Sequence, residues 1–216
     1  MKIFKHEQEK DTLFIIYLAR VLFAGLIIFE LLNFLKILQF NTQFTWLGLV
    51  ITSIVSLVIL EYIANKYIKV KGSYLHYSMW LIVWAALALD AFGDFFHWYG
   101  RFNWWDQFVH WFVSAVVCFV LFIGINAFWV DKFKFSLLMK TGRLKLSLLL
   151  AATSTMTLSA MYEVEEYVED VIFHTNRLGP GADTANDLFL NLVGVLTAVV
   201  FVIIYYQVTH RRKVFK

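Results

Sequence analysis

The chain has 216 residues, of which 60% are hydrophobic and 16% are charged. A soluble domain of this length carries far more charge, so the composition excludes a soluble globular protein and predicts an integral membrane protein. The formal net charge is +3. The basic residues gather on one side of the predicted spans, as membrane topology explains, and we therefore expect no nucleic acid among the partners.

Six stretches are long and apolar enough to cross a bilayer, which takes about 20 helical residues. Transmembrane β-strands would alternate in polarity over about ten residues, and the sequence lacks that pattern. We therefore predict an all-α fold, a polytopic transmembrane bundle of about six helices forming one domain over residues 1–216. The predicted spans cover residues 13–35, 45–66, 76–98, 104–129, 145–168 and 186–208.

The basic residues predict the orientation of these spans, because cytoplasmic loops keep an excess of Lys and Arg. With six spans, both termini share one side with the loops after the second and fourth spans. That side holds most of the 19 Lys and Arg residues, whereas the other side holds Lys36, Arg101 and Arg177. We expect cytoplasmic termini and a multi-pass protein of the cell membrane, inner or plasma, with membrane lipids as partners.

The first two spans each carry one isolated acid, Glu30 and Glu61. Each acid lies toward one end of its predicted span. We interpret them as residues that snorkel toward the membrane surface or pair with Lys36 or Lys66.

The third and fourth spans bring acidic and histidine residues to one end of a predicted hairpin. Asp90, Asp94 and His97 project from one face of the third span within about 60°, and Asp106 and His110 lie one turn apart on the fourth. If the neighbouring tryptophans mark the interface, Asp90 lies about 12 Å below it at 1.5 Å per residue. Ionisable residues at such depth are expensive and predict a functional site on the extracytoplasmic side.

The fifth and sixth spans add further acids at the same predicted end. Glu163 and Glu166 share a face of the fifth span. Asp183, Asp187 and Asn191 recur at helical spacing in the sixth, where Asp183 also suits a helix N-cap. We interpret the remaining acidic and histidine residues of this region as a solvated rim: Glu165, Glu169, Asp170 and His174.

Carboxylates that converge in a low dielectric cannot all stay ionised unless a cation neutralises them. The oxygen-rich donor set with imidazole suits a divalent ion, namely Mg²⁺, Mn²⁺, Ca²⁺ or Zn²⁺. We expect His110 or Glu166 to carry protons in catalysis. The candidate metal ligands are Asp90, Asp94, Asp106, His110, Glu163, Glu166, Asp183 and Asp187.

Simpler interpretations stand beside several of these assignments. Asp106 and His110 can cap and hydrogen-bond the start of a helix at a wet interface. Arg101 and Arg177 can act as counter-charges, or they can bind a lipid phosphate or a substrate carboxylate. With Asn191 they are the candidate substrate-binding residues.

Two sets of motifs resemble known families. Asp106 to His110, Glu163 to Glu166, and Asp183 to Gly194 are similar to the sparse signature of VanZ-like membrane proteins. The segment from Leu89 to Asp106 resembles the YjdF type of inner-membrane proteins. Together the resemblance spans roughly residues 85–200, and Glu166 stands where VanZ-like proteins often have Gln. It implies a role in the cell envelope without implying a particular reaction.

Three functional classes fit these observations. The first is a metal-dependent hydrolase or transferase acting on an amphipathic, lipid-like envelope substrate. The second is a structural or accessory membrane protein in which a cation clamps helices together. The third, less favoured, is a cation or proton transporter, since inverted repeats and broken helices are not visible.

Overall fold

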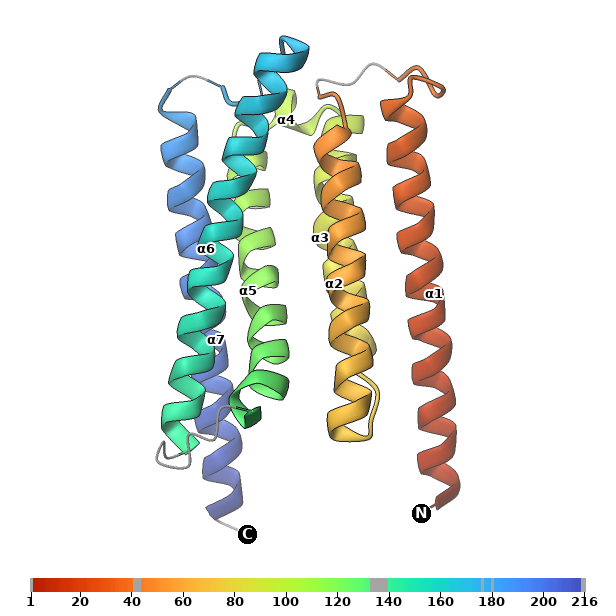
Figure 1. The fold of residues 1–216 in the computed structure, drawn as a ribbon, viewed down its shortest axis with the longest axis vertical. Coiled ribbons are helices and arrows are strands. Elements are labelled where there is room, and N and C mark those ends of the chain that lie inside the picture. Colours follow the sequence, from red (N-terminus) through yellow and green to blue (C-terminus); the bar gives the residue numbers. More distant parts are fainter. Residues whose placement is uncertain (1, 41–43, 133–139, 176, 180, 215–216) are drawn as a thin grey trace. The chain divides into compact units, whose positions relative to one another are not determined.

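The computed structural model describes residues 2–40, 44–132, 140–175, 177–179 and 181–214, and every regular element in those ranges is a helix. The all-α fold is therefore confirmed, and six of the helices are long and apolar enough to cross a membrane. Figure 1 shows them as long ribbons. They are α1 (Lys2–Phe34), α2 (Leu47–Lys71), α3 (Tyr77–Phe95), α5 (Trp105–Lys132), α6 (Lys140–Phe173) and α7 (Asp183–Val214).

Each predicted span coincides with one of these helices. The helices α1, α6 and α7 extend well past the apolar stretches that predicted them. Hydropathy identifies only the apolar part of a helix, which suits lipid. The backbone hydrogen bonds that define the helix can continue into the more polar residues at its ends.

The third predicted span ends earlier than expected. Helix α3 stops at Phe95, and His97 adopts a left-handed backbone conformation with φ 58° before the short helix α4 (Trp98–Arg101). The prediction that His97 shares a helical face with Asp90 and Asp94 is therefore wrong. His97 therefore lies outside α3, and its side chain is exposed.

The described chain divides into two compact units. Unit 1 comprises Met1–Trp105 and Val168–Arg177, and unit 2 comprises Asp106–Tyr167 and Leu178–Lys216. The last residues of α6 thus belong to unit 1, while the rest of that helix belongs to unit 2. The expectation of a single domain stays a prediction.

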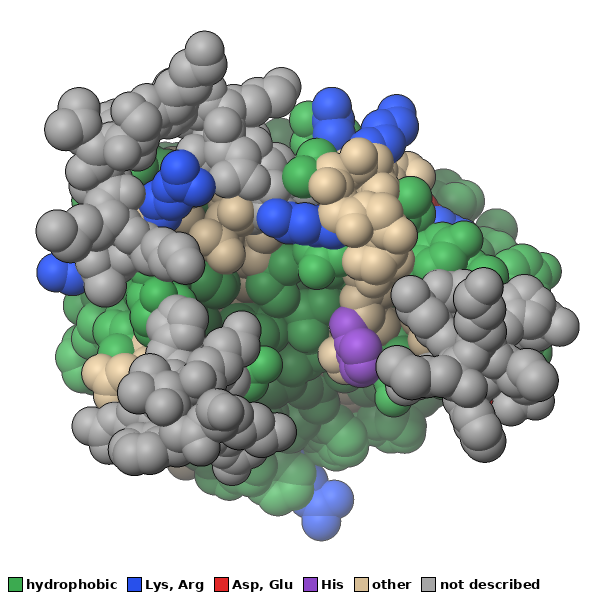
Figure 2. All heavy atoms as spheres, turned by 90° about the horizontal axis from the view of Figure 1, so that it is seen from below, with side chains coloured by type: hydrophobic (Ala, Val, Ile, Leu, Met, Phe, Trp, Pro, Cys, Tyr) green, Lys and Arg blue, Asp and Glu red, His purple; other side chains and the backbone are tan. Residues whose placement is uncertain are grey.

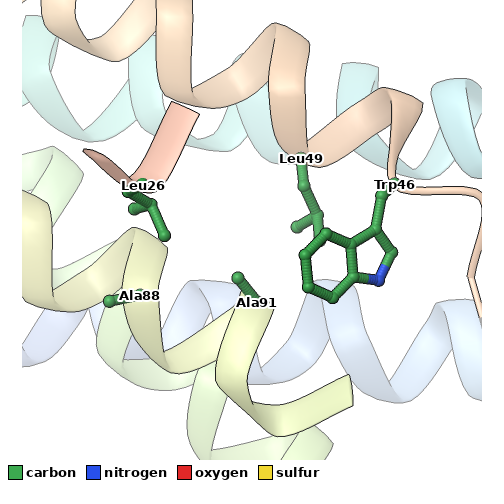
Figure 3. Packing of buried hydrophobic residues seen from close by; sticks show 5 residues of the cluster. All are labelled: Leu26, Trp46, Leu49, Ala88 and Ala91. Atoms are coloured by element: carbon green, nitrogen blue, oxygen red, sulfur yellow. The ribbon is translucent and has the colours of Figure 1, made fainter. Parts of the chain in front are cut away.

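Unit 1 is built on three mutually contacting helices, α1, α2 and α3. Its hydrophobic cluster joins Leu26, Trp46, Leu49, Ala88 and Ala91, and α3 contributes the two small residues (Figure 3). Phe29 packs edge-on against Trp46 with ring centroids 5.3 Å apart. Small residues on one helix allow close approach of its neighbours, which is how membrane helices pack without a hydrophobic driving force between them.

Unit 2 packs α5, α6 and α7 through a second cluster of small side chains. Cys118, Ala151, Val195 and Ala198 are its buried members. Gly194 of α7 lies so close to the backbone of Trp111 and Ala115 on α5 that a β-carbon would collide with it. These contacts place the polar ends of the three helices beside one another.

Large hydrophobic side chains also cover the outside of both units. Phe14 on α1, Val58 on α2 and Phe201 on α7 are each more than half exposed. Figure 2, seen from below, shows such hydrophobic surface together with Lys and Arg side chains. An outer surface of this kind is stable in lipid rather than in water.

Candidate functional site

The candidate site lies in unit 2, where α5 and α7 begin. Asp106 occupies the first turn of α5, and His110 follows one turn later on the same face. Asp183 occupies the first turn of α7, with Asp187 one turn later. Negative side chains are favourable in a first turn because the backbone N–H groups there leave a partial positive charge.

Three of the predicted ligands come together. Donor atoms of Asp106, His110 and Asp187 all lie within 4.8 Å of one another. The Nε2 atom of His110 is 3.5 Å from Asp106 Oδ1 and 3.8 Å from Asp187 Oδ1. Two metal–ligand bonds of about 2.0–2.2 Å each can join atoms up to about 4.4 Å apart, so both distances suit a shared ion.

The three side chains differ in exposure. The Asp187 side chain is 6% exposed and that of His110 is 12% exposed, whereas that of Asp106 is 38% exposed. The cluster therefore has a closed side formed by α7 and an open side at Asp106. An open side is what a substrate or a coordinated water would need.

One oxygen of Asp187, Oδ1, indicates where a cation would bind. Its Oδ1 is buried and accepts no hydrogen bond from any described residue. A buried carboxylate oxygen without a hydrogen-bond donor is costly, and a nearby cation reduces that cost. The position of Oδ1 beside His110 therefore points to the place that a cation would occupy.

The remaining predicted ligands of unit 2 interact electrostatically with members of this cluster. Glu166, which is 9% exposed, interacts with His110. Glu163, which is 5% exposed, and Asp183 interact with Asp187. The structure thus groups all six predicted unit 2 ligands in one region, with Asp106, His110 and Asp187 in the closest arrangement.

A row of polar side chains continues from the cluster into the helix bundle of unit 2. Ser114 Oγ donates a hydrogen bond of 2.6 Å to Asn191 Oδ1 and lies 3.3 Å from Ser159 Oγ. Trp111 donates to Thr197. Asn191, which was predicted to bind substrate, is buried and joins α7 to α5.

The two predicted ligands on α3 belong to unit 1 and have partners there. Asp94 is fully buried, and its Oδ2 accepts hydrogen bonds from Trp46 Nε1 at 2.6 Å and from the Phe44 backbone at 3.3 Å. Asp90 Oδ1 accepts from the Tyr99 hydroxyl at 2.7 Å. Both carboxyl groups thus contribute to the local structure of unit 1.

The predicted solvated rim is wrong for Glu169. This residue is 2% exposed, and its Oε2 pairs with Arg177 Nη1 at 3.2 Å. The Thr45 hydroxyl and the Gly48 backbone also donate to it. Arg177 is 9% exposed and occupies the counter-charge role, whereas Arg101 is exposed and stacks on Phe102.

The interpretation of Glu30 is also wrong. Glu30 is fully buried and accepts a 3.0 Å hydrogen bond from Ser53 instead of reaching the membrane surface. Glu61 pairs with Arg20 rather than with Lys66. Sequence reasoning missed both contacts; the available signal for Glu30 was its helical spacing of four residues from Leu26 on the buried face.

Six long apolar helices with carboxyl groups buried between them define a multi-pass α-helical membrane protein. The chain belongs to the family described as "Predicted membrane protein (DUF2238)", which matches residues 16–208. No curated protein and no solved structure is significantly similar to the chain. The VanZ-like and YjdF-type resemblance is not confirmed by this family match.

Proposed function

We propose that unit 2 binds a divalent metal ion through Asp106, His110 and Asp187, and that the ion serves chemistry on an amphipathic, lipid-like substrate of the cell envelope. The observation that carries the proposal is the buried Asp187 Oδ1, which lacks a hydrogen-bond donor among the described residues and lies 3.8 Å from His110 Nε2. A cation would complete the electrostatic surroundings of that oxygen.

The donor set suits the same four divalent ions that the sequence predicts. Two carboxylates and one imidazole suit Mn²⁺ or Zn²⁺, and the additional carboxylates Glu163, Glu166 and Asp183 would also favour Mg²⁺ or Ca²⁺. Three protein ligands with an exposed side resemble the arrangement of catalytic metal sites, which keep one position open. Here Asp106, whose side chain is 38% exposed, forms the exposed side of the site.

An ion held here would activate water or polarise a phosphoryl or carbonyl group, as a metal-dependent hydrolase or transferase requires. Glu166 is the better proton carrier, because His110 would be occupied as a ligand. The position of the cluster at the ends of apolar helices favours a substrate whose polar group sits at the membrane surface. We expect Asn191 of unit 2 to contribute to substrate binding if the substrate replaces its hydrogen bond with Ser114.

A structural cation site is the second candidate. Its support is that the ligands come from two helices, with Asp106 and His110 on α5 and Asp187 on α7. An ion shared by both helices would hold their ends together and would stabilise the fold without taking part in catalysis. Cation or proton transport is a third and less favoured candidate.

Metal content decides whether the site binds an ion at all. Elemental analysis of the purified protein is expected to show stoichiometric divalent metal, and Asp187→Asn is expected to lose it. Asp11→Asn serves as the control, because Asp11 is exposed and lies on α1. Wild-type protein that stays free of metal after incubation with Mg²⁺, Mn²⁺, Ca²⁺ and Zn²⁺ in turn would refute the proposal.

Chelation separates the catalytic from the structural candidate. The metal-loaded protein and its chelated form are each incubated with a lipid extract of the host membrane, and the lipids are compared by mass spectrometry. Catalysis predicts a lipid product that is lost when the metal is chelated. It also predicts that Glu166→Gln forms no product although this variant keeps its metal. A large fall in thermal stability on chelation, with no lipid product, would instead assign the ion a structural role.

A further inference from the structure

Unit 1 contains a buried carboxyl group with an unusual set of neighbours. Glu30 of α1 is fully buried, and its Oε1 accepts a hydrogen bond from Ser53 Oγ of α2 at 3.0 Å. Its second oxygen, Oε2, has no hydrogen-bond partner among the described residues. Oε1 therefore accepts a hydrogen bond, whereas Oε2 has no hydrogen-bond donor among the described residues.

Apolar buried residues lie one helical turn from Glu30 and from Ser53. Leu26 lies one turn earlier on α1, and Leu49 lies one turn before Ser53 on α2; both are members of the buried cluster of unit 1 (Figure 3). Ala91 of α3 completes this region and is fully buried. Burial of an ionised carboxylate here would carry a large desolvation cost, which a single hydrogen bond from Ser53 offsets only in part.

No positive side chain in the described part of unit 1 pairs with Glu30. Arg20 lies about 15 Å away along the same helix at 1.5 Å per residue, and it is already paired with Glu61. From α3, Asp90 interacts with Glu30 electrostatically, and this interaction would be repulsive if both groups were ionised. Helix α2 brings no titratable group between Leu47 and Leu60.

The other acids near this end of unit 1 are accounted for by their own donors. Asp94 is held by Trp46, and Glu169 is held by Arg177. Glu30 differs from both because its Oε2 has no hydrogen-bond donor among the described residues. The difference is what the sequence pattern alone did not reveal.

We infer that Glu30 is an intramembrane proton-binding site, with Oε1 as the carbonyl oxygen that accepts from Ser53 and Oε2 as the oxygen that carries the proton. A neutral carboxylic acid places one proton on the oxygen that otherwise has no partner, and it removes the repulsion from Asp90. This site lies in unit 1 and does not depend on metal binding in unit 2.

Infrared spectroscopy tests the inference directly, because a protonated carboxylic acid and a carboxylate have separate stretching bands. The wild-type protein at neutral pH is expected to show a protonated carboxyl band that Glu30→Gln lacks. Glu61→Gln is the matched control and is expected to keep that band, since Glu61 is paired with Arg20. If Glu30→Gln removes a carboxylate band instead, Glu30 is ionised and the inference is overturned.

Variants of Ser53 provide a second readout that needs no change at Glu30. Ser53→Ala removes the hydrogen bond to the carbonyl oxygen and is expected to shift the protonated carboxyl band to higher frequency. Ser53→Thr keeps a hydroxyl group and is expected to leave the band near its wild-type position. A band that does not respond to Ser53→Ala would contradict the assignment to Glu30.

Cation replacement distinguishes a proton from a metal ion as the occupant. The spectrum is recorded in choline chloride and then in NaCl or KCl at equal ionic strength. The protonated band is expected to be the same in all three salts and after chelation of divalent metal. Conversion of the band to a carboxylate on adding Na⁺ or K⁺ would show that a metal cation occupies this position and would overturn the inference.

Discussion

Asp94 and Asp187 are both buried acids, but their surroundings differ. The Oδ2 atom of Asp94 receives an indole donor and a backbone donor, while Oδ1 of Asp187 has no hydrogen-bond partner among the described residues. A satisfied carboxylate stabilises local structure, whereas an unsatisfied one marks a place where a ligand improves the energy. Burial by itself therefore does not separate structural acids from functional ones.

Trp46→Phe tests the structural role of Asp94. The substitution removes the 2.6 Å donor to a fully buried carboxyl group, and we expect a loss of about 1–3 kcal/mol in the free energy of unfolding. Trp104→Phe is the control, because Trp104 is 55% exposed. Thermal unfolding in detergent provides the measurement, and equal stability of the two variants would contradict this role.

Arg177→Met tests the buried ion pair. The two side chains are 2% and 3% exposed, and removing one partner of a buried pair typically costs about 3–5 kcal/mol. We expect the combined Glu169→Gln and Arg177→Met variant to recover part of this loss, because it leaves no unpaired charge. Arg101→Met, at an exposed position, should leave the unfolding temperature almost unchanged.

At the scale of elements, the start of α2 depends on the end of α6. Trp46, the residue before α2, has a left-handed conformation with φ 68° and provides no side-chain cap. Glu169 of α6 takes that place, accepting the Gly48 backbone N–H at 3.0 Å. A helix start needs acceptors for its free N–H groups, and here a residue far along the chain provides one.

The packing of α5 against α7 depends on the absence of a side chain at one position. A β-carbon at Gly194 would collide with the carbonyl oxygen of Trp111 and lie 3.1 Å from the backbone nitrogen of Ala115. Backbone atoms of a helix cannot move aside as a flexible side chain can. The same contact holds the two helices that carry the candidate ligands.

Gly194→Ala should therefore destabilise unit 2. We expect a loss of about 1–3 kcal/mol, the usual cost of overpacking, together with weaker metal binding because the helices bearing Asp106 and Asp187 are displaced. Gly25→Ala is the matched control, since it is also a helical glycine and a β-carbon there meets nothing within 4 Å. Unfolding temperature and metal content together check this prediction.

At the scale of the whole molecule, the lipid-facing surface and the basic residues predict how the protein lies in the membrane. Helix α2 carries Lys69 and Lys71 in its last turn, and basic side chains are visible at the end shown in Figure 2. The excess of Lys and Arg on one side predicts that this side is cytoplasmic. The candidate metal cluster would then face the extracytoplasmic side.

Labelling of single cysteines tests this orientation. In a Cys118→Ala background, Ser73→Cys and Gly181→Cys place a thiol at exposed positions outside the long helices. A membrane-impermeant maleimide is expected to label Gly181→Cys in intact cells and Ser73→Cys only after permeabilisation. The reverse pattern would place the termini outside the cytoplasm.

Much of the fold could be predicted because membrane helices are determined locally. A run of about 20 apolar residues must form a helix in lipid to satisfy its own backbone, and all six predicted spans coincide with helices. The pairing of Asp106 with His110 also follows from spacing along one helix. The approach of Asp187 to that pair did not follow from local spacing, since it requires α7 to pack against α5.

The sequence by itself determined that this protein is an all-helical membrane protein and which faces of its helices carry acids. Only the tertiary structure decided the partners of several acids, because those partners lie far along the chain. Ser53 is 23 residues from Glu30, Trp46 is 48 from Asp94, and Thr45 is 124 from Glu169. Helical periodicity gives the direction of a side chain, whereas its partner depends on how separate helices pack.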